Sequence, residues 1–454
     1  MNLKTIAVSA LAVAVAAPAM LASQPASSET VQLELWSRQD PSGPLRAGNV
    51  VKAADRLNAA LEAEGSDTRV EVVVRESPAG GFDDDSLQLL RVFGIGEGPD
   101  MFIAAHEWIC AFQQEGFVLN LEELIAANGE HFDDIFPSLW ESTKCLGERY
   151  GIPQDAEARM FFYNKKLMRE AGLDEAFIEG LPDQVLAGEI TMAGIAELAK
   201  QIVDNSGAEI GILHRPSVGP DYIMVFQSYG NTFNDEETGN LLLEEDKLTA
   251  AFGWFEWNVQ NGVTPANNTA MEWGDIKASF YENDETAFFM YGIWDLGSAA
   301  FPTHGVPSDE EGFFKDWGWT ASPPAEKGGS PGSLTHPIIY AVAADTEHPE
   351  LAVRLLGFAS DADLNTDHAV TTTHIGIKPE QLEDPRYQEA WTLARATEML
   401  EFTKFLPNNP AFADLNRIIY TALQGVESGR LSAEDAALFV IDEAESQLEG
   451  VIVR

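Results

Sequence analysis

The sequence contains few basic residues. Among its 454 residues, 28 are Lys or Arg and 73 are Asp or Glu, which gives a formal net charge of -45 and a pI near 4.3. Nucleic acids and anionic membranes are bound through basic surfaces, so this balance argues against both as partners. We interpret the acidity as a strongly solvated surface that keeps the protein soluble, as in a salty habitat.

Cysteine is also scarce, and so are long apolar segments. The two cysteines, Cys110 and Cys145, do not form a zinc motif, and their spacing is compatible with a disulfide or with two free buried thiols. Beyond residue 26 no run of 18 apolar residues occurs, so the sequence predicts no membrane span. The 8 His are scattered, and we expect no metal site and no cofactor.

Motifs for catalysis are missing as well. The sequence has no nucleophile elbow, no Ser/His/Asp set and no zinc helix motif. Gly94, Gly96 and Gly98 follow a predicted helix and not a strand, so the context of a dinucleotide loop is absent. Paired carboxylates could serve a glycosidase, but 73 acids make chance pairs common. We therefore expect a protein that is not an enzyme, and an exported glycosidase or lyase stays open as an alternative.

Residues 1–26 have the pattern of a secretory signal peptide. Lys4 is their only charge, residues 5–21 are almost entirely apolar, and small residues follow. No cysteine follows the apolar run to carry a lipid anchor, and a twin-arginine motif is absent. The prediction is a periplasmic protein that is exported by a cleaved signal peptide and is not lipid-anchored.

The rest of the chain alternates between strand and helix patterns. Apolar strands are predicted at 31–36, 68–75 and 99–104, with helices at 50–64 and 86–93 between them, which is typical of a doubly wound α/β lobe. The later predicted strands are 209–213, 285–291, 317–321 and 338–343, and the later predicted helices are 165–172, 191–204, 221–229, 248–260, 275–281 and 349–358, with residues 380–454 mostly helical.

The stretch 150–164, YGIPQDAEARMFFYN, is apolar at both ends and polar at its centre. Asp155, Glu157 and Arg159 stand in that centre, and buried polar groups are costly without partners. A cleft between two lobes, lined by these side chains, explains the pattern. We also expect a new helix to start at Asn164.

Polar and aromatic side chains also follow several predicted strands. Planar polar groups suit sugar hydroxyls, and aromatic rings suit the C–H face of a pyranose. Trp294 follows a glycine at a strand end and is the better pocket candidate, whereas Trp254, Trp257, Trp317 and Trp319 have the spacing of core residues. The predicted ligand-binding residues are Arg38, Gln39, Asp40, Glu107, Trp108, Asp155, Glu157, Arg159, Tyr222, Trp294, His336 and His374. We expect His336 and His374 to be surface or packing groups in preference to metal ligands.

Five segments together resemble a known family. They are GPDMFIAAHEWICAFQQEGFVLNL (98–121), YGIPQDAEARMFFYNKKLMREAGL (150–173), FYENDETAFFMYGIWDL (280–296), IIYAVAADTEHPELAVRLLGFAS (338–360) and ESGRLSAEDAA (427–437). In order and spacing the chain resembles the family 1 extracellular solute-binding proteins, the maltose-binding-protein-like receptors of bacterial sugar ABC importers. The resemblance implies an α/β, two-lobed periplasmic-binding-protein fold (type II) whose lobes are joined by crossing hinge strands.

The resemblance also implies where the lobes and hinges lie. Crossings are expected near 152–154, 321–323 and 374–378. Lobe I is expected to hold 29–152 plus 323–373, and lobe II to hold 153–322 plus 374–454.

By the same resemblance, Glu107, Trp108, Glu157 and the loop 37–40 occupy positions of polar sugar contacts, Trp294 that of a stacking aromatic, and Tyr222 is a weaker match. Two positions depart from the maltodextrin binders. Ala104 stands where they carry a stacking Trp, and an aromatic is missing near Leu415 and Asn416. We therefore expect a mono- or disaccharide or a polyol.

The expected function is that of a monomeric substrate-binding protein of a carbohydrate ABC importer, which delivers its sugar to membrane permease subunits. One alternative is the same fold binding a phosphorylated polyol such as glycerol 3-phosphate, with Arg38, Arg159 and Arg215 as basic groups. An adhesion or sensor protein is a further alternative that the sequence leaves open.

Overall fold

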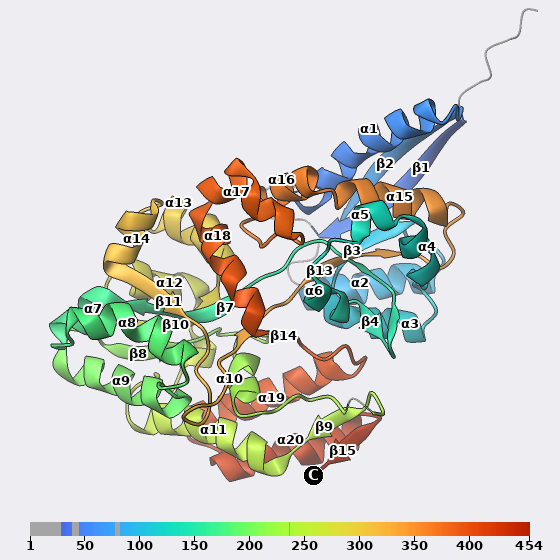
Figure 1. The fold of residues 1–454 in the computed structure, drawn as a ribbon. Coiled ribbons are helices and arrows are strands. Elements are labelled where there is room, and N and C mark those ends of the chain that lie inside the picture. Colours follow the sequence, from blue (N-terminus) through green and yellow to red (C-terminus); the bar gives the residue numbers. More distant parts are fainter. Residues whose placement is uncertain (1–28, 39–44, 78–81, 236) are drawn as a thin grey trace, which may run out of the picture.

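The computed structural model describes residues 29–38, 45–77, 82–235 and 237–454 (Figure 1). The predicted signal peptide and the predicted contacts Gln39 and Asp40 lie outside these ranges. Two β-sheets lie in separate parts of the molecule, and helices surround each of them (Figure 1).

The first sheet has five strands in the order β2-β1-β3-β13-β6. Strands β1, β2 and β3 are parallel, whereas β13 runs antiparallel to β3 and β6. Every residue of β3 and β13 is buried, as expected for strands covered on both faces. The strands are β1 (Glu29–Arg38), β2 (Thr68–Ser77), β3 (Met101–Ala105), β6 (Ile152–Pro153) and β13 (Ile338–Val342), and the main helices are α1 (Gly48–Ala63), α2 (Phe82–Gly94) and α15 (Pro349–Ala359).

The second sheet has four strands in the order β11-β7-β10-β8. One of its two inner strands, β7, leads directly into α7, and the Asn164 side chain caps that helix by accepting hydrogen bonds from the Lys166 and Leu167 amides. The predicted helix start at Asn164 is confirmed. The strands are β7 (Arg159–Asn164), β8 (Ile210–Leu213), β10 (Thr286–Gly292) and β11 (Trp317–Thr320), and the main helices are α7 (Lys165–Glu170), α8 (Glu175–Leu186), α9 (Met192–Asn205), α11 (Glu245–Gln260), α12 (Trp273–Tyr281), α19 (Phe412–Glu427) and α20 (Ala433–Gln447).

The chain passes between the two sheets three times. The first passage lies between β6 and β7, and the second between β11 and β13. Helix α16 (Ala362–Thr372) packs on α1, whereas Trp391, which begins α18, stacks on Trp319 of the second sheet, so the third passage lies between these helices. Ala156 and Ile375 pair in an isolated antiparallel bridge, which joins the first passage to the third. The lobe boundaries given above stay predictions.

The remaining elements are short. The C-terminal region, predicted to be mostly helical, also contains β14 and β15, which pair with β12 and β9. These elements are α3 (Ile109–Gln114), α4 (Glu122–Ala127), α5 (Gly129–Phe132), α6 (Pro137–Glu141), α10 (Ile223–Ser228), α13 (Phe301–Thr303), α14 (Glu310–Asp316), α17 (Pro385–Glu389), α18 (Trp391–Thr397), β4 (Lys144–Cys145), β5 (Glu148–Arg149), β9 (Leu241–Leu243), β12 (Ser333–Leu334), β14 (Thr403–Lys404) and β15 (Val451–Val453). None of the described helices combines the length and apolar character that crossing a bilayer requires.

Candidate functional site

Asp155, Glu157 and Arg159 lie in and next to the first passage between the sheets, and all three are buried. Buried charges are tolerated when they are paired. Each of the three is paired here, mostly with side chains from distant parts of the chain. We call the connected group the polar seam; it consists of Arg46, Glu107, Asp155, Glu157, Arg159, Arg215, Asp221, Trp294, His336, His368 and His374.

Asp155 ties the first passage to segments on either side of it. Arg46 Nη1 donates to Asp155 Oδ2 at 2.6 Å, and His368 Nε2 lies 2.8 Å from the same oxygen. Burial raises the pKa of Asp155, but the charges of Arg46 and His374 and the bond to His368 outweigh burial and hold the pKa well below its usual range. The carboxylate is therefore ionised at neutral pH and joins three separate segments.

Glu157 is the next carboxylate of the polar seam. Arg159 Nη1 donates to Glu157 Oε2 at 2.6 Å. The ring of His374 lies between Glu157 and Arg46, with its Nε2 3.3 Å from Glu157 Oε1 and 2.9 Å from Arg46 Nη2. Burial raises the pKa of Glu157, but Arg159 and the neighbouring histidines outweigh it and lower the pKa to about 2.

Asp221 and two arginines extend the polar seam into the second sheet's side. Arg159 Nε donates to Asp221 Oδ1 at 3.0 Å, and Arg215 Nε bonds to the other carboxylate oxygen. The Arg159 guanidinium covers the ring of Trp294 at 4.6 Å, and the ring of His374 stacks on Trp294 at 6.3 Å. Arg159 and His374 thus hold the indole that was predicted to stack on a sugar.

The C-terminal end of β3 supplies the opposite end of the polar seam. Residues His106–Trp108 form a 3-10 helix directly after this strand. His336 Nε2 lies 2.8 Å from Glu107 Oε1 and His336 Nδ1 lies 3.9 Å from Glu157 Oε2, so His336 joins the two carboxylates. Trp108 is buried beside Glu107. In open α/β sheets, ligands collect at this edge.

The remaining predicted contacts lie apart from these bonds. The Tyr222 hydroxyl donates to Asn416 Oδ1 at 2.6 Å and is fully buried, so this phenol holds α10 against α19. Arg38 ends β1, where its charge acts on Asp85.

His336 and His374 are buried and hydrogen-bonded, which excludes the surface position that the sequence left open for them.

Several seam residues were missed from sequence. Arg46 lies a few residues beyond the loop 37–40 that was predicted to contact the sugar. Asp221 directly precedes Tyr222. His368 lies within α16, where no local pattern distinguishes it from a surface residue.

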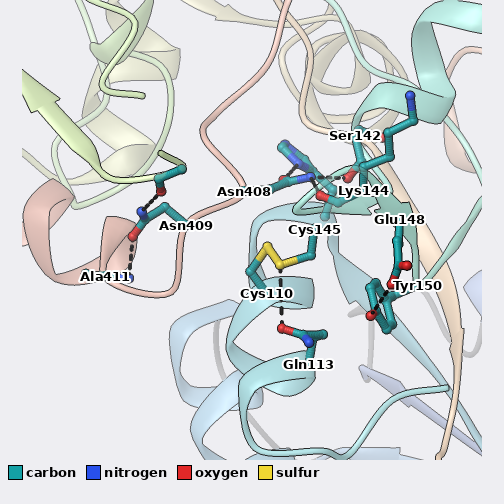
Figure 2. Close-up of a disulfide and its surroundings, with 12 residues drawn as sticks. Cys110, Gln113, Ser142, Lys144, Cys145, Glu148, Tyr150, Asn408, Asn409 and Ala411 are labelled. Carbon is teal, nitrogen blue, oxygen red and sulfur yellow. Dashed lines mark hydrogen bonds between the residues drawn. A yellow bond between two sulfur atoms is a disulfide. The ribbon is translucent and has the colours of Figure 1, made fainter. Parts of the chain in front are cut away.

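A large groove lies apart from the polar seam: no seam residue, and none of the predicted contacts that the structure describes, lines it. Its volume is about 1290 Å³, and segments from both sides of the passage line it, including the Cys110–Cys145 disulfide, residues 141–147, 237–240 and 405–411. The disulfide answers the question that the cysteine spacing left open. Figure 2 shows Asn408 bonded to Ser142 and Lys144 above this disulfide.

Within the described ranges, His, Cys, Asp and Glu side chains form no group of three or more that could hold a metal ion.

Comparison with known proteins agrees with this architecture. A family model described as bacterial extracellular solute-binding protein matches residues 47–365. The maltotriose-binding protein of Pyrococcus abyssi is 22% identical over 350 residues, which are 75% of this chain and 67% of the relative. The galactooligosaccharide-binding protein of Bacillus subtilis is 23% identical over 445 residues, 97% of this chain and 94% of the relative.

Solved structures support the same fold. The GacH receptor of Streptomyces glaucescens, determined unliganded and with acarbose, has a TM-score of 0.70 at 17% identity and covers 93% of this chain and 100% of its own. The sugar-binding protein MalE of Xanthomonas citri has a TM-score of 0.71 at 16% identity, covering 92% and 97%. The fold is the two-lobed α/β arrangement of these proteins. The family model matches well over half of the chain's length, so the chain belongs to the bacterial extracellular solute-binding protein family.

Proposed function

We propose that this chain is the substrate-binding protein of a carbohydrate ABC importer. It captures a neutral sugar or polyol between its lobes and delivers it to membrane permease subunits. It reaches the periplasm through a cleaved signal peptide and acts as a monomer without catalysis. The predicted contacts, from Arg38, Gln39 and Asp40 on one lobe to Trp294 on the other, belong to this proposal.

The observation that supports it most is the charge pairing of the polar seam. Hydrogen-bonding groups stand at the passage between two sheets, and Trp294 offers an apolar plate beside them. Such a combination suits a ligand with hydroxyl groups on an apolar ring. The relatives are named for maltotriose, galactooligosaccharide and arabinooligosaccharide, which are all neutral saccharides.

The same pairing argues against a phosphorylated polyol. Arg159 and Arg215 both bond to Asp221, and Arg159 also bonds to Glu157. Four carboxylates of the polar seam, Glu107, Asp155, Glu157 and Asp221, face three arginines, Arg46, Arg159 and Arg215. A phosphate needs surplus positive charge, and the carboxylates here already neutralise the guanidinium groups.

The size of the sugar is open to direct test. By the family resemblance, Ala104 stands where maltodextrin binders carry a stacking Trp, and an aromatic of those binders is missing near Leu415 and Asn416, which favours a mono- or disaccharide. The names of the relatives favour larger oligosaccharides. A panel should therefore run from monosaccharides to trisaccharides.

Closure of the lobes on the sugar is the proposed mechanism. Sugar that contacts both lobes binds the closed form better, so binding shifts the population toward closure, and the permease engages that form. The bonds of Asp155 to Arg46 and His368 lie at the first passage and would keep the hinge segments together while the lobes move.

A thermal-shift screen tests the proposal, because a bound ligand raises the melting temperature by mass action. The panel contains glucose, galactose, arabinose, maltose, maltotriose, β-1,4-galactobiose, α-1,5-arabinobiose, glycerol and glycerol 3-phosphate. We expect at least one neutral sugar to raise the melting temperature and to be recovered unchanged. A shift with glycerol 3-phosphate alone, or cleavage of any saccharide, would contradict the proposal.

A further inference from the structure

A second, smaller pocket lies at the edge of the second sheet, where β11 is the outermost strand. Helices α8 and α14 pack on β11, and Trp391 of α18 stacks on Trp319 of this strand (Figure 1). Among the described residues, none that belongs to the polar seam or lines the large groove also lines this pocket. Its volume is about 390 Å³, within the range of about 300–1000 Å³ that is typical of small-molecule sites. It is therefore a separate cavity of ligand size that the proposed function does not use.

The buried end of the pocket depends on Gly318. A Cβ at this position would lie 2.3 Å from Tyr163 Cζ and 2.5 Å from the Tyr163 hydroxyl, so only glycine lets this ring lie across the edge strand. Tyr163 is 2% exposed and lines the pocket, and its hydroxyl forms no hydrogen bond with a described residue. Burial raises the pKa of Tyr163, and so does the charge of Glu179, so the phenol keeps its proton. The pocket thus offers a buried donor without a partner, a group that gains from an acceptor on a ligand.

The walls of the pocket are apolar. They are formed by Leu186, Phe314, Trp319 and Met399. The Trp319 ring is held in place by stacking on Trp391 at 5.8 Å and by the tilted Phe314 ring at 5.0 Å. A fixed indole suits the apolar body of a ligand and also attracts a positive charge.

The two basic groups that line the pocket are already neutralised. Lys165 Nζ lies 2.7 Å from both carboxylate oxygens of Glu179. Arg395 Nε donates to Glu310 Oε1 at 2.8 Å, and Glu310 does not line the pocket. Neither cation is therefore left over for a phosphate or a carboxylate.

Two acidic groups at the mouth of the pocket are exposed and unpaired. Asp183 belongs to α8, and Glu398 begins the 3-10 helix that follows α18. Neither forms an ion pair with a described residue, in contrast to Glu179. Acidic side chains of the described residues form no group that could hold a metal ion. The surplus negative charge therefore repels anions and attracts an organic cation.

We propose that this pocket binds a small primary amine with an apolar body that carries a hydroxyl group. The ammonium group pairs with Asp183 and Glu398, the body lies against Trp319, and the hydroxyl oxygen accepts a hydrogen bond from Tyr163. A neutral molecule of the same shape leaves the carboxylates without a counter-charge, and an anion is repelled. The site goes beyond the proposed sugar site and does not rest on it.

The test uses probes that differ in one group at a time. Tyramine has the ammonium group, an aromatic body and a hydroxyl. Its neutral counterpart is 2-(4-hydroxyphenyl)ethanol, its anionic counterpart is 4-hydroxyphenylacetate, and phenethylamine lacks only the hydroxyl. Because the length of the amine matters, 4-hydroxybenzylamine, which is one carbon shorter, is titrated as well.

The variants remove the two ends of the site separately. Asp183→Asn combined with Glu398→Gln removes the charges at the mouth, and Tyr163→Phe removes the buried hydroxyl. A matched control is Asp55→Asn combined with Glu115→Gln, which removes two exposed charges far from the pocket in sequence and on the side of the first sheet. The melting temperature of each variant without probe shows whether it is folded.

Affinity is measured by ligand-observed NMR titration at neutral pH in about 0.15 M NaCl, where charges more than about 8 Å apart are screened. We expect the better hydroxylated amine to bind the wild type more tightly than the neutral and the anionic probe. The double substitution at the mouth should weaken its binding about 5–10-fold, and the control should bind like the wild type. Tyr163→Phe should weaken its binding about 5-fold and leave phenethylamine binding unchanged, because phenethylamine has no hydroxyl to lose.

Several results would overturn the assignment. These are no binding of either hydroxylated amine, equal affinity for the neutral probe, wild-type affinity in the folded double variant, or an equal loss in the control, which would indicate attraction to the acidic surface as a whole. Equal losses of both amines in Tyr163→Phe would show that the phenol acts only on the structure. Since Asp183 and Glu398 are exposed, their substitution decides the outcome even if Tyr163→Phe does not fold. Sugar binding should be unchanged in the double variant, so failure of the sugar screen and failure of this site are distinguishable.

Discussion

Asp155→Asn is the substitution that most directly tests whether the charge pairing at the passage holds the fold together. The Asp155 side chain is 0% exposed and bonds to Arg46 and His368. Asparagine has almost the same shape but no charge. The change therefore leaves the packing in place and leaves the buried Arg46 guanidinium without its carboxylate partner.

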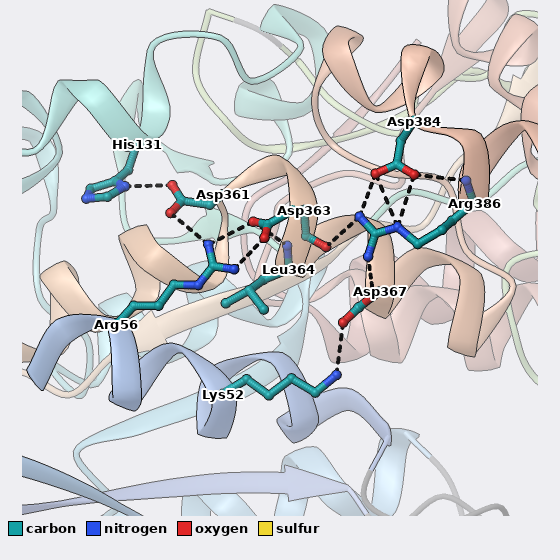
Figure 3. Close-up of polar contacts among 9 residues, drawn as sticks. All are labelled: Lys52, Arg56, His131, Asp361, Asp363, Leu364, Asp367, Asp384 and Arg386. Atoms are coloured by element: carbon teal, nitrogen blue, oxygen red, sulfur yellow. Dashed lines mark hydrogen bonds and ion pairs between the residues drawn. The ribbon is translucent and has the colours of Figure 1, made fainter. Parts of the chain in front are cut away.

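The expected cost follows from the burial of this pair. Breaking a buried ion pair by removing one partner costs about 3–5 kcal/mol, because the remaining charge stays buried without compensation. The matched control is Asp367→Asn on α16. Asp367 is 36% exposed and pairs with Lys52 at 3.0 Å and with Arg386 on the surface (Figure 3). Exposed pairs of this kind contribute about 1 kcal/mol or less.

The pH dependence gives a second check on the same substitution. The pKa of Asp155 is lower in the folded than in the unfolded chain, so its contribution to stability is present above the unfolded pKa, about 3.9, and is lost as pH falls through the folded value. Asp155→Asn should remove this part of the acid sensitivity. At pH 7 the variant should be less stable than the wild type by the about 3–5 kcal/mol expected for the broken ion pair.

The assay is urea unfolding of the three proteins at pH 7, followed by far-UV circular dichroism and by tryptophan fluorescence. We expect Asp155→Asn to lose several times more free energy of unfolding than Asp367→Asn, with similar denaturant slopes. If the two variants lost the same amount, or if Asp155→Asn lost less than about 1 kcal/mol, the buried pair would not stabilise the passage and the reasoning would be wrong.

Three further predictions follow from single contacts. A Cβ at Gly292 would lie 1.7 Å from the Trp294 ring, so Gly292→Ala should displace the indole. Like Trp294→Ala, this variant should stay folded and should lose the sugar-induced thermal shift. An unchanged thermal shift would remove Trp294 from the site. Asn164→Ala removes the cap of α7 and the bond from Asn164 Nδ2 to Asp284 Oδ1, so it should cost at least about 1 kcal/mol in urea unfolding, and no loss would show that the cap is dispensable. The Cys110–Cys145 disulfide closes a loop of 35 residues, so replacing both cysteines by serine should lower the free energy of unfolding by about 3–4 kcal/mol under oxidising conditions. As a check, the variant and the reduced wild type should be equally stable.

Local patterns in the sequence were sufficient for most of the secondary structure. The strands of both sheets follow short apolar runs, and Asn164 ends one of them with a side chain that can cap the next helix. The polar centre of 150–164 indicated a passage between two lobes, since three charged residues could not stay unpaired in a core. Periodicity also identified core tryptophans: Trp254, Trp317 and Trp319 are buried, as predicted, whereas Trp257 is only partly buried and packs against the core.

Other features depended on contacts that no local pattern reveals. Strands β14 and β15 have two and three residues, too few to show an alternating pattern, and they form only by pairing with β12 and β9. The spacing of the two cysteines left their pairing undecided, and the fold brings their Cα atoms within 5.3 Å.

The sequence by itself determined the kind of fold, the family resemblance and the residue types available at the passage. Only the tertiary structure decided how their charges and protons are arranged. Arg46 meets His374 across 328 positions of the chain, and His106 meets Asn408 across 302. The physical reason is that helix and strand patterns arise from neighbours in sequence, whereas the pKa, pairing and proton position of a buried group depend on whichever distant side chains the fold places around it.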